Sequence, residues 1–489
     1  MTSAPPGVLP VLAIDRESDT PLYRQIYEGY REAILDGRLK AGERLPSTRS
    51  LAEELGVSRF PVLNAFDQLL AEGYCESRVG AGTFVAATLP EDLGLPGRPA
   101  EGPDVRPPPG PRPRAGGPAA SLTPVPFARG GSTAFSVGGV AREHFPFRTF
   151  ATLVSRHARS LDAGRVHYGP ALGVLSFREA ICDYLRTARG VRCEPRQVIV
   201  TSGSQQALDF CARVLLEPGS GVWVEDPGYW GAQDILRVGG ARLVPVPVDG
   251  SGLDVAAGIE RAPTARAVFV TPSHQFPLGV TMSASRRLHL LEWARQSGAW
   301  ILEDDYNSEY RYESQPIASL QGLDRDARVL YIGTFSKVLA PALRLGYMVV
   351  PEDLAPSFSA ARHVIDISPP TFLQHVMADF LREGHFGRHL RRMRKLYRER
   401  RSALVRALES ALGDDVEILG EQAGLHLVVT LPPGTDDRAI SERARDEELH
   451  VLSLSSCYLE GGRPGLVLGY GGVSVEEMPE AARRLARLL

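Results

Sequence analysis

Residues 90 to 118 read PEDLGLPGRPAEGPDVRPPPGPRPRAGGP, a run in which proline and glycine leave few side chains for a hydrophobic core. Proline fixes the backbone φ angle and removes a hydrogen-bond donor, so such a run favours an extended, semi-rigid tether. The chain of 489 residues is also too long for one ordinary core. We therefore expect a small folding unit over residues 15–88, a linker over 89–125 and a large unit over 126–489.

The composition excludes several classes of protein. Hydrophobic residues make up 43% of the chain and charged residues 23%, as in globular proteins. The net charge of -3 does not by itself indicate a nucleic-acid partner, although an average can conceal a basic module. The five cysteines lack CxxC spacing, so we expect buried thiols instead of a disulfide framework or a metal site. Without a signal sequence or a membrane-spanning run, the expected location is the cytoplasm, with no membrane partner.

The small unit carries apolar residues at helical spacing over 22–34, 51–55 and 62–70, which predicts three helices. Ser47 can open the second helix and Gly56 can end it. Ser58 has the right chemistry to cap the third helix, where Pro61 is tolerable because it lies in the first turn. Two helices joined by a turn that contains glycine are typical of a helix-turn-helix.

The stretch YCESRVGAGTFVAA, residues 74–87, has two strand-like ends around Gly80-Ala81-Gly82 and predicts a hairpin, or wing. With the preceding DTPLYRQIYEGYREAILDGRLKAGERLPSTRSLAEELGVSR, it resembles the GntR-type winged helix-turn-helix over residues 18–88. The resemblance implies that double-stranded promoter DNA is a partner. It places these residues at phosphates or bases: Ser47, Arg49, Ser58, Arg59, Arg78 and Gly82. The alternative for each arginine is a solvated surface role, and Phe60-Pro61 departs from the polar residues common there.

In the large unit, apolar runs alternate with helical stretches. The runs are VIVT from residue 198, VWVE from 222, AVFVT from 267, WILED from 300, VLYIG from 329 and GYMVV from 346. This alternation predicts an α/β fold with a mostly parallel sheet and helices on both faces. Such sheets bind ligands at the ends of their strands.

The stretch GTFSKVLAPALRLGY, residues 333–347, is the most informative part of the large unit. The Lys337 amine can form a Schiff base with an aldehyde cofactor, and the nearby hydroxyls and arginine suit a phosphate. Upstream, WILEDDY places acids at a strand end, where a carboxylate could pair with a protonated pyridine nitrogen. Without the neighbouring motifs, Lys337 would be interpreted as a surface lysine. An acid at the end of a strand would likewise be interpreted as a cap for the loop that follows.

Two further motifs lie between these strands. TSGSQQALDF, from residue 201, couples a strand to a helix whose first N–H groups could cradle a phosphate. EDPGYWG supplies Tyr229, an aromatic side chain suited to stacking on a planar ring. Alone, these motifs are also compatible with an ordinary strand-to-helix turn and a core tyrosine.

Taken in order with TPSHQFPLG, these motifs resemble the fold-type I aminotransferases over residues 126–489, with a smaller C-terminal α/β part. The resemblance implies pyridoxal 5′-phosphate (PLP) as the cofactor, held by Lys337 as an internal aldimine. It assigns Asp304 to the pyridine nitrogen, Tyr306 to the ring hydroxyl and Tyr229 to stacking on the ring. It assigns the phosphate to Ser204, Gln205, Ser336 and Arg344, and the ring edge to His274 or Gln275.

A GntR-type winged helix fused to such a domain resembles the MocR family, and this resemblance covers nearly the whole chain. It implies a head-to-tail homodimer that regulates transcription and senses PLP, a small amine or an amino acid through chemistry at Lys337. The alternative is a working aminotransferase with an accessory DNA-binding module. The resemblance leaves a transaminase-like half-reaction open. LSLSSCYLEGGRPG offers only Arg463 as a late arginine, so the anchor for a substrate carboxylate stays open.

Overall fold

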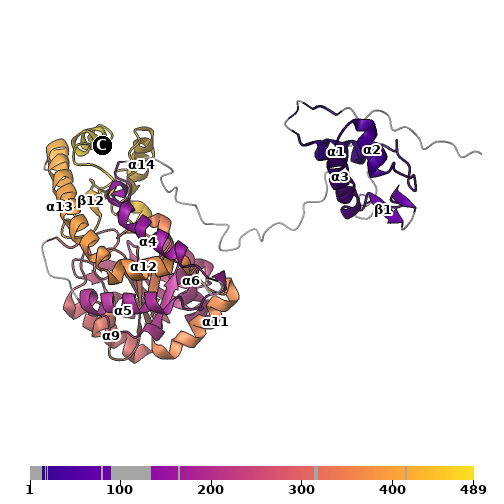
Figure 1. The fold of residues 1–489 in the computed structure, drawn as a ribbon. Coiled ribbons are helices and arrows are strands. Elements are labelled where there is room, and N and C mark those ends of the chain that lie inside the picture. The colour runs from indigo at the N-terminus through magenta and orange to yellow at the C-terminus, as the bar shows by residue number, and fades with distance from the viewer. Residues whose placement is uncertain are drawn as a thin grey trace, which may run out of the picture. The chain divides into compact units, whose positions relative to one another are not determined.

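The computed structural model describes residues 14–16, 18, 20–78, 81–89, 134–162, 166–312, 318–413 and 416–489 (Figure 1). The chain divides into two compact units, Met1–Arg112 and Pro113–Leu489. The predicted linker over 89–125 lies outside the described residues except for Leu89. The boundaries inferred from the sequence therefore stay predictions, and each unit is described by itself.

The small unit contains the three predicted helices, α1 (Leu22–Leu35), α2 (Thr48–Leu55) and α3 (Arg59–Ala71). Tyr30 of α1 packs edge-on against Phe66 of α3, with ring centroids 5.3 Å apart. The Ser47 hydroxyl caps α2 by accepting a hydrogen bond from the Ser50 N–H at 3.1 Å. Ser58 occupies the N-cap position of α3, but its side chain makes no capping bond, so the expected cap is only positional.

The predicted wing is present as an antiparallel hairpin of β1 (Cys75–Arg78) and β2 (Gly82–Val85). Gly82 lies directly opposite Arg78 and has a φ of 112°, a conformation that glycine adopts without strain. The Arg78 guanidinium stacks over the Phe84 ring at 4.6 Å. Sequence and structure therefore agree on all the secondary structure predicted for this unit.

The large unit is built on an eight-stranded sheet in the order β3-β10-β9-β8-β7-β4-β5-β6. The strands are β3 (Val198–Thr201), β4 (Gly221–Asp226), β5 (Arg242–Asp249), β6 (Gly252–Leu253), β7 (Ala267–Val270), β8 (Trp300–Asp305), β9 (Val329–Thr334) and β10 (Gly346–Val349). Strands β5, β4, β7, β8 and β9 run parallel, and β10 runs antiparallel to both neighbours. Only the short segment 335–345 joins β9 to β10, whereas a parallel neighbour needs a longer crossover. The predicted, mostly parallel sheet is confirmed.

Side chains alternate between the two faces of this sheet, and each face carries its own core. Val198 and Val200 of β3 belong to the core that contains Phe177 of α5 (Leu175–Arg189). Ile199 belongs to the opposite core, with Phe210 of α6 (Ser204–Leu215). The other helices around the sheet are α4 (Phe147–Arg159), α7 (Trp230–Val238), α8 (Val255–Arg261), α9 (Ala284–Ser297), α10 (Leu320–Leu323), α11 (Ala355–Asp366) and α12 (Phe372–Arg382). Figure 1 shows α4, α5 and α12 packed side by side.

The C-terminal part is a smaller α/β layer, as expected. Its antiparallel sheet has the order β11-β12-β14-β13, from β11 (Ile418–Leu419), β12 (His426–Thr430), β13 (Leu452–Ser453) and β14 (Gly465–Gly469). The helices α13 (His385–Leu412), α14 (Asp437–Asp446) and α15 (Met478–Ala486) accompany it. All five cysteines are buried free thiols, which confirms the expectation for them. Among the described residues, no helix has the length and apolar character needed to span a membrane.

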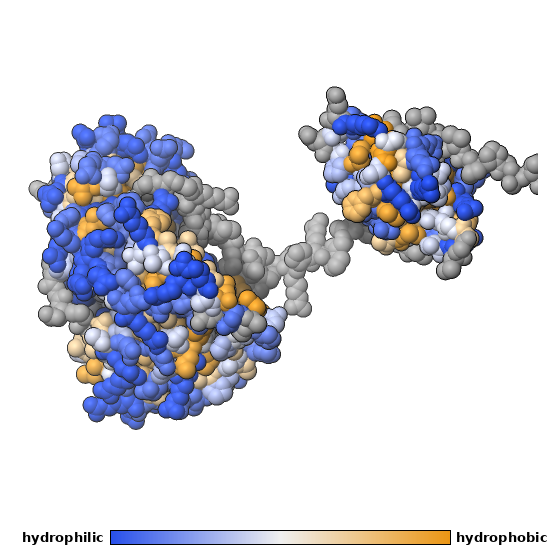
Figure 2. All heavy atoms as spheres, viewed as in Figure 1, coloured by the Kyte–Doolittle hydropathy of each residue, from blue (hydrophilic) through white to orange (hydrophobic). Residues whose placement is uncertain are grey.

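Hydrophilic side chains cover most of the face of each unit that Figure 2 presents, with hydrophobic residues exposed between them. Some of these exposed apolar side chains are large. In the large unit they include Val166, Tyr168 and Val364, and in the small unit Phe60. Such side chains take no part in the core of the unit that carries them.

Candidate cofactor site and DNA-binding surface

A cavity of about 750 Å³ lies at the carboxyl ends of the parallel strands. Tyr229 follows β4, Thr271 follows β7, Asp304 lies near the end of β8, and Thr334 ends β9. Parallel strands bring their carboxyl ends to one edge of a sheet, and α/β proteins bind ligands at that edge. The cavity therefore has the position expected from the strand pattern.

Lys337 lies in the loop after β9 and lines the cavity. Its amine donates a hydrogen bond to the Gly138 carbonyl at 3.4 Å. Burial lowers the pKa of Lys337, and the nearby charge of Asp304 raises it in part. A side chain at residue 138 would overlap with the Lys337 amine, so the close approach requires glycine.

Asp304 is the carboxylate that faces the cavity. Asp304 is 3% exposed, and its Oδ1 atom has no hydrogen-bond partner among the described residues. Burial raises the pKa of Asp304 to about 7, with Asp305 adding to the shift and Lys337 opposing it. A buried carboxylate without a partner is costly, so this atom needs a cationic or donating group from a ligand.

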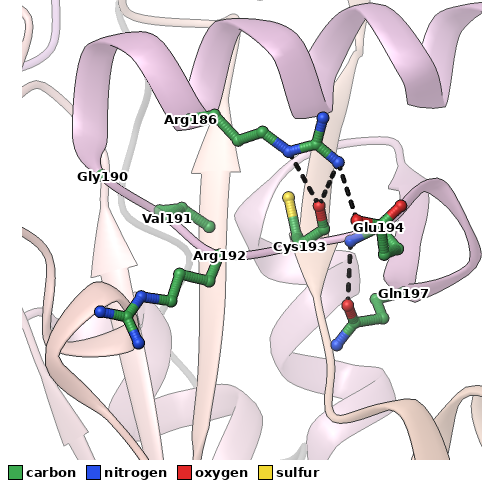
Figure 3. A pocket seen from close by; sticks show the side chains of 7 residues that line it. All are labelled: Arg186, Gly190, Val191, Arg192, Cys193, Glu194 and Gln197. Carbon is green, nitrogen blue, oxygen red and sulfur yellow. Dashed lines mark hydrogen bonds and ion pairs between the residues drawn. The ribbon is translucent and has the colours of Figure 1, made fainter.

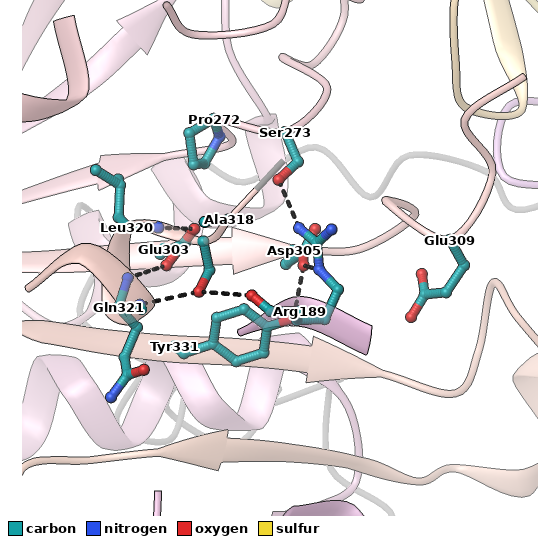
Figure 4. Close-up of polar contacts among 12 residues, drawn as sticks. Arg189, Pro272, Ser273, Glu303, Asp305, Glu309, Ala318, Leu320, Gln321 and Tyr331 are labelled. Atoms are coloured by element: carbon teal, nitrogen blue, oxygen red, sulfur yellow. Dashed lines mark hydrogen bonds and ion pairs between the residues drawn. The ribbon is translucent and has the colours of Figure 1, made fainter. Parts of the chain in front are cut away.

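The neighbouring Asp305 points the other way, as strand alternation requires. It forms an ion pair with Arg189 at 2.7 Å and accepts a hydrogen bond from the Tyr331 hydroxyl at 2.6 Å (Figure 4). Glu303, also turned away from the cavity, accepts the backbone N–H groups of Leu320 and Gln321. The three consecutive acids of β8 thus have separate environments, and only Asp304 lines the cavity.

Tyr306 also lines the cavity, and its hydroxyl lies 3.1 Å from Nδ1 of His274. Burial raises the pKa of Tyr306 well above its usual value and lowers that of His274 to about 3, so the phenol stays protonated and the imidazole neutral. Gln275 donates to the Pro227 carbonyl at 2.8 Å. The structure places His274 and Gln275 behind the cavity wall, and Phe276 is the member of this motif that lines it.

The first turn of α6 forms one end of the cavity with Ser204 and Gln205. Gly203 precedes the helix with a φ of 132°, a conformation that glycine adopts without strain, and the Arg344 guanidinium lies beside it. Arg344 itself has a φ of 48°, a left-handed conformation that is unfavourable for arginine. A cation beside the positive end of a helix is stabilised by an anion between them, so this arrangement fits a phosphate.

The remaining predicted residues lie around these groups. Ser336 lines the cavity beside Lys337, and its backbone N–H donates to the Thr334 hydroxyl at 3.1 Å. Tyr229 lines the wall, and its hydroxyl accepts a hydrogen bond from Gln205 at 3.0 Å. The structure therefore brings all the predicted cofactor residues to one cavity except His274 and Gln275, which stand behind its wall.

Sequence reasoning missed several lining residues. Gly138, Arg142, Trp230 and His426 line the cavity but belong to none of the residues predicted for the site. Trp230 lies within the EDPGYWG motif, which was a usable signal. The others come from distant segments with no motif of their own. Arg463, the late arginine, does not line the cavity but pairs with Glu417 at 2.9 Å on the surface.

A second hollow of about 460 Å³ lies beside the C-terminal end of α5 (Figure 3). Arg186 spans it by donating to the Cys193 carbonyl at 2.8 Å and to the Glu194 carboxylate at 3.1 Å. Cys193 also approaches Cys182 of α5, with 3.5 Å between the two sulfurs. These contacts fasten the loop after α5 to that helix, so we assign the hollow a structural role.

The predicted DNA-binding residues lie on the surface of the small unit. Ser47 and Arg49 are exposed at the start of α2, and Ser58 and Arg59 are exposed at the start of α3. The Arg59 side chain donates to the Thr48 hydroxyl at 3.0 Å, which ties the two helix starts together. Arg78 and Gly82 face each other on the wing.

Comparisons with known proteins match each of the two units to a family. Residues 22–85 match the family described as bacterial regulatory proteins, gntR family, and residues 144–485 match aminotransferase class I and II. The chain is 42% identical to the probable rhizopine catabolism regulatory protein MocR of Rhizobium meliloti, over 97% of this chain and 95% of that protein. It is 34% identical to the pyridoxine biosynthesis transcriptional regulator PdxR of Corynebacterium glutamicum, over 94% of each chain.

A solved structure resembles the large unit. It is LysN of Thermus thermophilus, an alpha-aminoadipate aminotransferase complexed with N-(5′-phosphopyridoxyl)-L-leucine, with a TM-score of 0.67 and 30% identity over 73% of this chain and 92% of that chain. The matched domain and this neighbour make PLP the cofactor. The cavity fits PLP, because unpartnered Asp304 suits a ring nitrogen and Arg344 beside the α6 N-terminus suits a phosphate.

Proposed function

Because this chain belongs to the MocR family of transcription regulators, we propose that it alters its binding to a promoter when PLP, a small amine or an amino acid engages the cavity at Lys337. The supporting observation is the pairing of two sites in one chain. The small unit exposes the residues that we assign to DNA contacts, and the large unit gathers around Lys337 most of the groups that we assign to PLP. We also propose the domain boundaries 15–88, 89–125 and 126–489.

When bound, PLP supplies an aldehyde that condenses reversibly with amines and a ring that withdraws electrons. Burial lowers the pKa of Lys337, which increases the neutral, nucleophilic fraction of its amine. The Asp304 carboxylate would hold a proton at the ring nitrogen, and the protonated Tyr306 hydroxyl would donate to the ring oxygen. Ser204, Gln205, Ser336 and Arg344 would hold the phosphate, and Tyr229 would stack on the ring.

The same lysine gives the site two states. An effector amine competes with Lys337, so the Lys337 amine is occupied in one state and free in the other. When free, it has the Gly138 carbonyl at 3.4 Å as a hydrogen-bond partner. A ligand shifts an equilibrium only through such differential contacts. The segment 136–140 lines the cavity and is therefore the element that we expect to respond first.

On the DNA side, Ser47, Arg49, Ser58 and Arg59 stand at helix starts, where exposed N–H groups and arginines contact phosphates and bases. Arg78 and Gly82 bring the wing to the duplex. Arginine contacts to phosphates supply affinity, and contacts to base edges supply specificity.

The head-to-tail homodimer rests on exposed apolar side chains of the large unit. Val166, Tyr168 and Val364 are 75%, 73% and 85% exposed. Gly169 packs against the Thr371 side chain, so the chain just after Tyr168 lies close to the chain that follows α11. Val364→Asp should convert the dimer to monomers in sedimentation velocity. Leu288→Asp, at a 60% exposed residue of α9, should not, and a dimer in both variants would contradict this surface.

The central test uses Lys337→Ala in the full chain. We expect this variant to lose the visible absorbance that PLP gives with the wild type and to yield no borohydride-trapped adduct on the GTFSK peptide. Lys395→Ala is the matched control, because Lys395 has an 82% exposed side chain on α13. The effector response of promoter binding should disappear with Lys337→Ala and persist with Lys395→Ala. An unchanged response in Lys337→Ala would overturn the proposal.

A catalytic aminotransferase is the second candidate, because Lys337, Asp304 and Tyr306 form an intact set in the cavity. The two candidates differ in turnover. Multiple turnover with a panel of amino acids and keto acids, at a rate that does not depend on DNA, would favour the enzyme. Formation of a single equivalent of product, with a change in the promoter footprint, would favour the sensor.

A further inference from the structure

Phe60 is the second residue of α3, and it is 70% exposed. The other large hydrophobic residues with notable exposure in the described part of the small unit are Tyr23 at 37% and Leu35 at 40%, both on α1. Burying a phenylalanine side chain contributes about 1.5–3 kcal/mol. An aromatic ring left in water at this position therefore contributes little to the fold.

The buried face of α3 shows which way Phe60 points. Val62, Ala65 and Leu69 are fully buried and fix the helix against the core of the small unit. Phe60 and Asp67, two turns apart, lie on the exposed face. The ring therefore projects from the first turn of α3 on the side away from the core.

The start of α3 is held in place by its neighbours. Arg59 donates to the Thr48 hydroxyl at 3.0 Å, and Pro61 restricts the backbone in the first turn. Ser58 makes no capping bond, so its hydroxyl is available to an outside partner such as a phosphate. In a helix-turn-helix, the N-terminal residues of the second helix contact base edges in the major groove. Phe60 is thus the apolar group at the place where bases are read.

Thymine is the base that offers an apolar group in the major groove, its 5-methyl, and phenylalanine is one of the side chains that contact it. Asn64, one turn after Phe60, is of the residue type that pairs with adenine. We propose that Phe60 reads a thymine of the operator by packing its ring on the 5-methyl group. This inference rests on the proposed DNA-binding function and adds the base that the small unit selects.

The experiment removes the methyl group from the DNA. The full-length, PLP-loaded wild type selects a duplex from a random-sequence library, and each thymine of that duplex is then replaced in turn by deoxyuridine. We expect one position in each half-site at which deoxyuridine weakens wild-type binding by about 3- to 10-fold, the scale set by one buried methyl. Phe60→Ala should bind the thymine duplex more weakly and show no effect of deoxyuridine at that position.

Two controls separate readout from folding. Phe60→Ala should keep the thermal unfolding profile of the wild type, because the ring is exposed. Tyr23→Ala, at the partly exposed tyrosine of α1, should keep the full sensitivity to deoxyuridine. Phe60→Leu should retain part of that sensitivity, since leucine also offers an apolar surface.

The outcomes distinguish this inference from the function it rests on. A wild type that binds the selected duplex but ignores every deoxyuridine overturns the role of Phe60 and leaves DNA binding intact. The role of Phe60 is also overturned if Phe60→Ala is still sensitive to deoxyuridine, or if the only effect of this substitution is on self-association of the protein. A wild type that selects no duplex overturns the regulator itself and the role of Phe60 with it.

Discussion

The guanidinium of Arg189 lies 2.7 Å from the carboxylate of Asp305, and both side chains are almost fully buried, with exposures of 3% and 1%. Arg189 also donates to the Ser273 hydroxyl at 2.9 Å (Figure 4). The pair neutralises one of the two adjacent aspartates of β8. Asp304 therefore remains as the carboxylate that a cofactor must satisfy.

Replacement of Arg189 should destabilise the large unit strongly. Arg189→Met leaves the buried Asp305 carboxylate without its cation, and breaking a buried ion pair in this way costs about 3–5 kcal/mol. Denaturant unfolding of the full chain measures the loss. The double variant Arg189→Met/Asp305→Asn should lose clearly less unfolding free energy than the two single variants lose together. An additive loss would show that the two side chains are not coupled.

The cofactor-free protein should show a specific pH dependence due to Asp304. Folding raises the pKa of this carboxyl from 3.8 to about 7, so between these values the folded protein binds a proton that the unfolded chain releases. The unfolding free energy therefore falls as the pH rises from about 4 to about 7. Asp304→Asn should be more stable than wild type at pH 8, by about 2 kcal/mol or more.

The advantage of Asp304→Asn should shrink as the pH is lowered to about 4, since the carboxyl of the folded wild type is then protonated and no longer bears the cost of a buried charge. Glu303, whose pKa burial also raises to about 7, is present in both proteins and cancels in the difference. Chemical denaturation of both proteins across this pH range measures the difference in their unfolding free energies. A difference that does not vary with pH would contradict the assigned protonation of Asp304.

Arg463→Ala should leave PLP binding unchanged. Its guanidinium pairs with Glu417 on the surface, and both side chains are more than half exposed, at 53% and 58%. Exposed pairs of this kind contribute up to about 1 kcal/mol. Titration of the variant with PLP, followed by absorbance, should reproduce the wild-type curve. A marked loss of affinity would place Arg463 at the cavity in a conformation other than the one described.

Arg49→Ala should weaken binding to all DNA sequences by a similar factor. The Arg49 side chain is 82% exposed, and its one described partner, Glu53, is also exposed. Removal of one phosphate contact should reduce the slope of log K against log salt by about 1. Arg213→Ala is the matched control, because Arg213 forms the same type of helical pair with Asp209 in the large unit. An unchanged slope in Arg49→Ala would argue against a phosphate contact.

Continuous apolar runs made most of the large sheet predictable, because strands buried on both faces have no polar side to interrupt them. The strand β5 was missed, since Pro245 and Pro247 interrupt its sequence and proline usually demotes a strand. The structure tolerates them next to the short strand β6 at the sheet edge. The reversal of β10 was also not foreseen, because its direction depends on the length of a loop and not on its own residues.

The site was predictable where one motif carried both the residue and its orientation. Strand alternation separates Asp304 from Asp305, but the sequence alone does not say which of them faces the cavity. Gly138 and His426 reach the cavity through tertiary packing of segments far from the Lys337 motif, so no local pattern indicates them. His274 lies one layer behind its expected place, because its ring supports Tyr306 instead of bordering the cavity.

The hydrophobic core of the small unit is drawn wholly from residues 14–89, and the other cores are drawn from residues 134–489. Each unit can therefore melt by itself, and no single midpoint describes the heat denaturation of the whole molecule. An excess of PLP should raise the melting temperature of the large unit, which binds it, and should leave that of the small unit unchanged. At an intermediate temperature, the protein can therefore keep the visible absorbance of bound PLP after it has lost its affinity for promoter DNA.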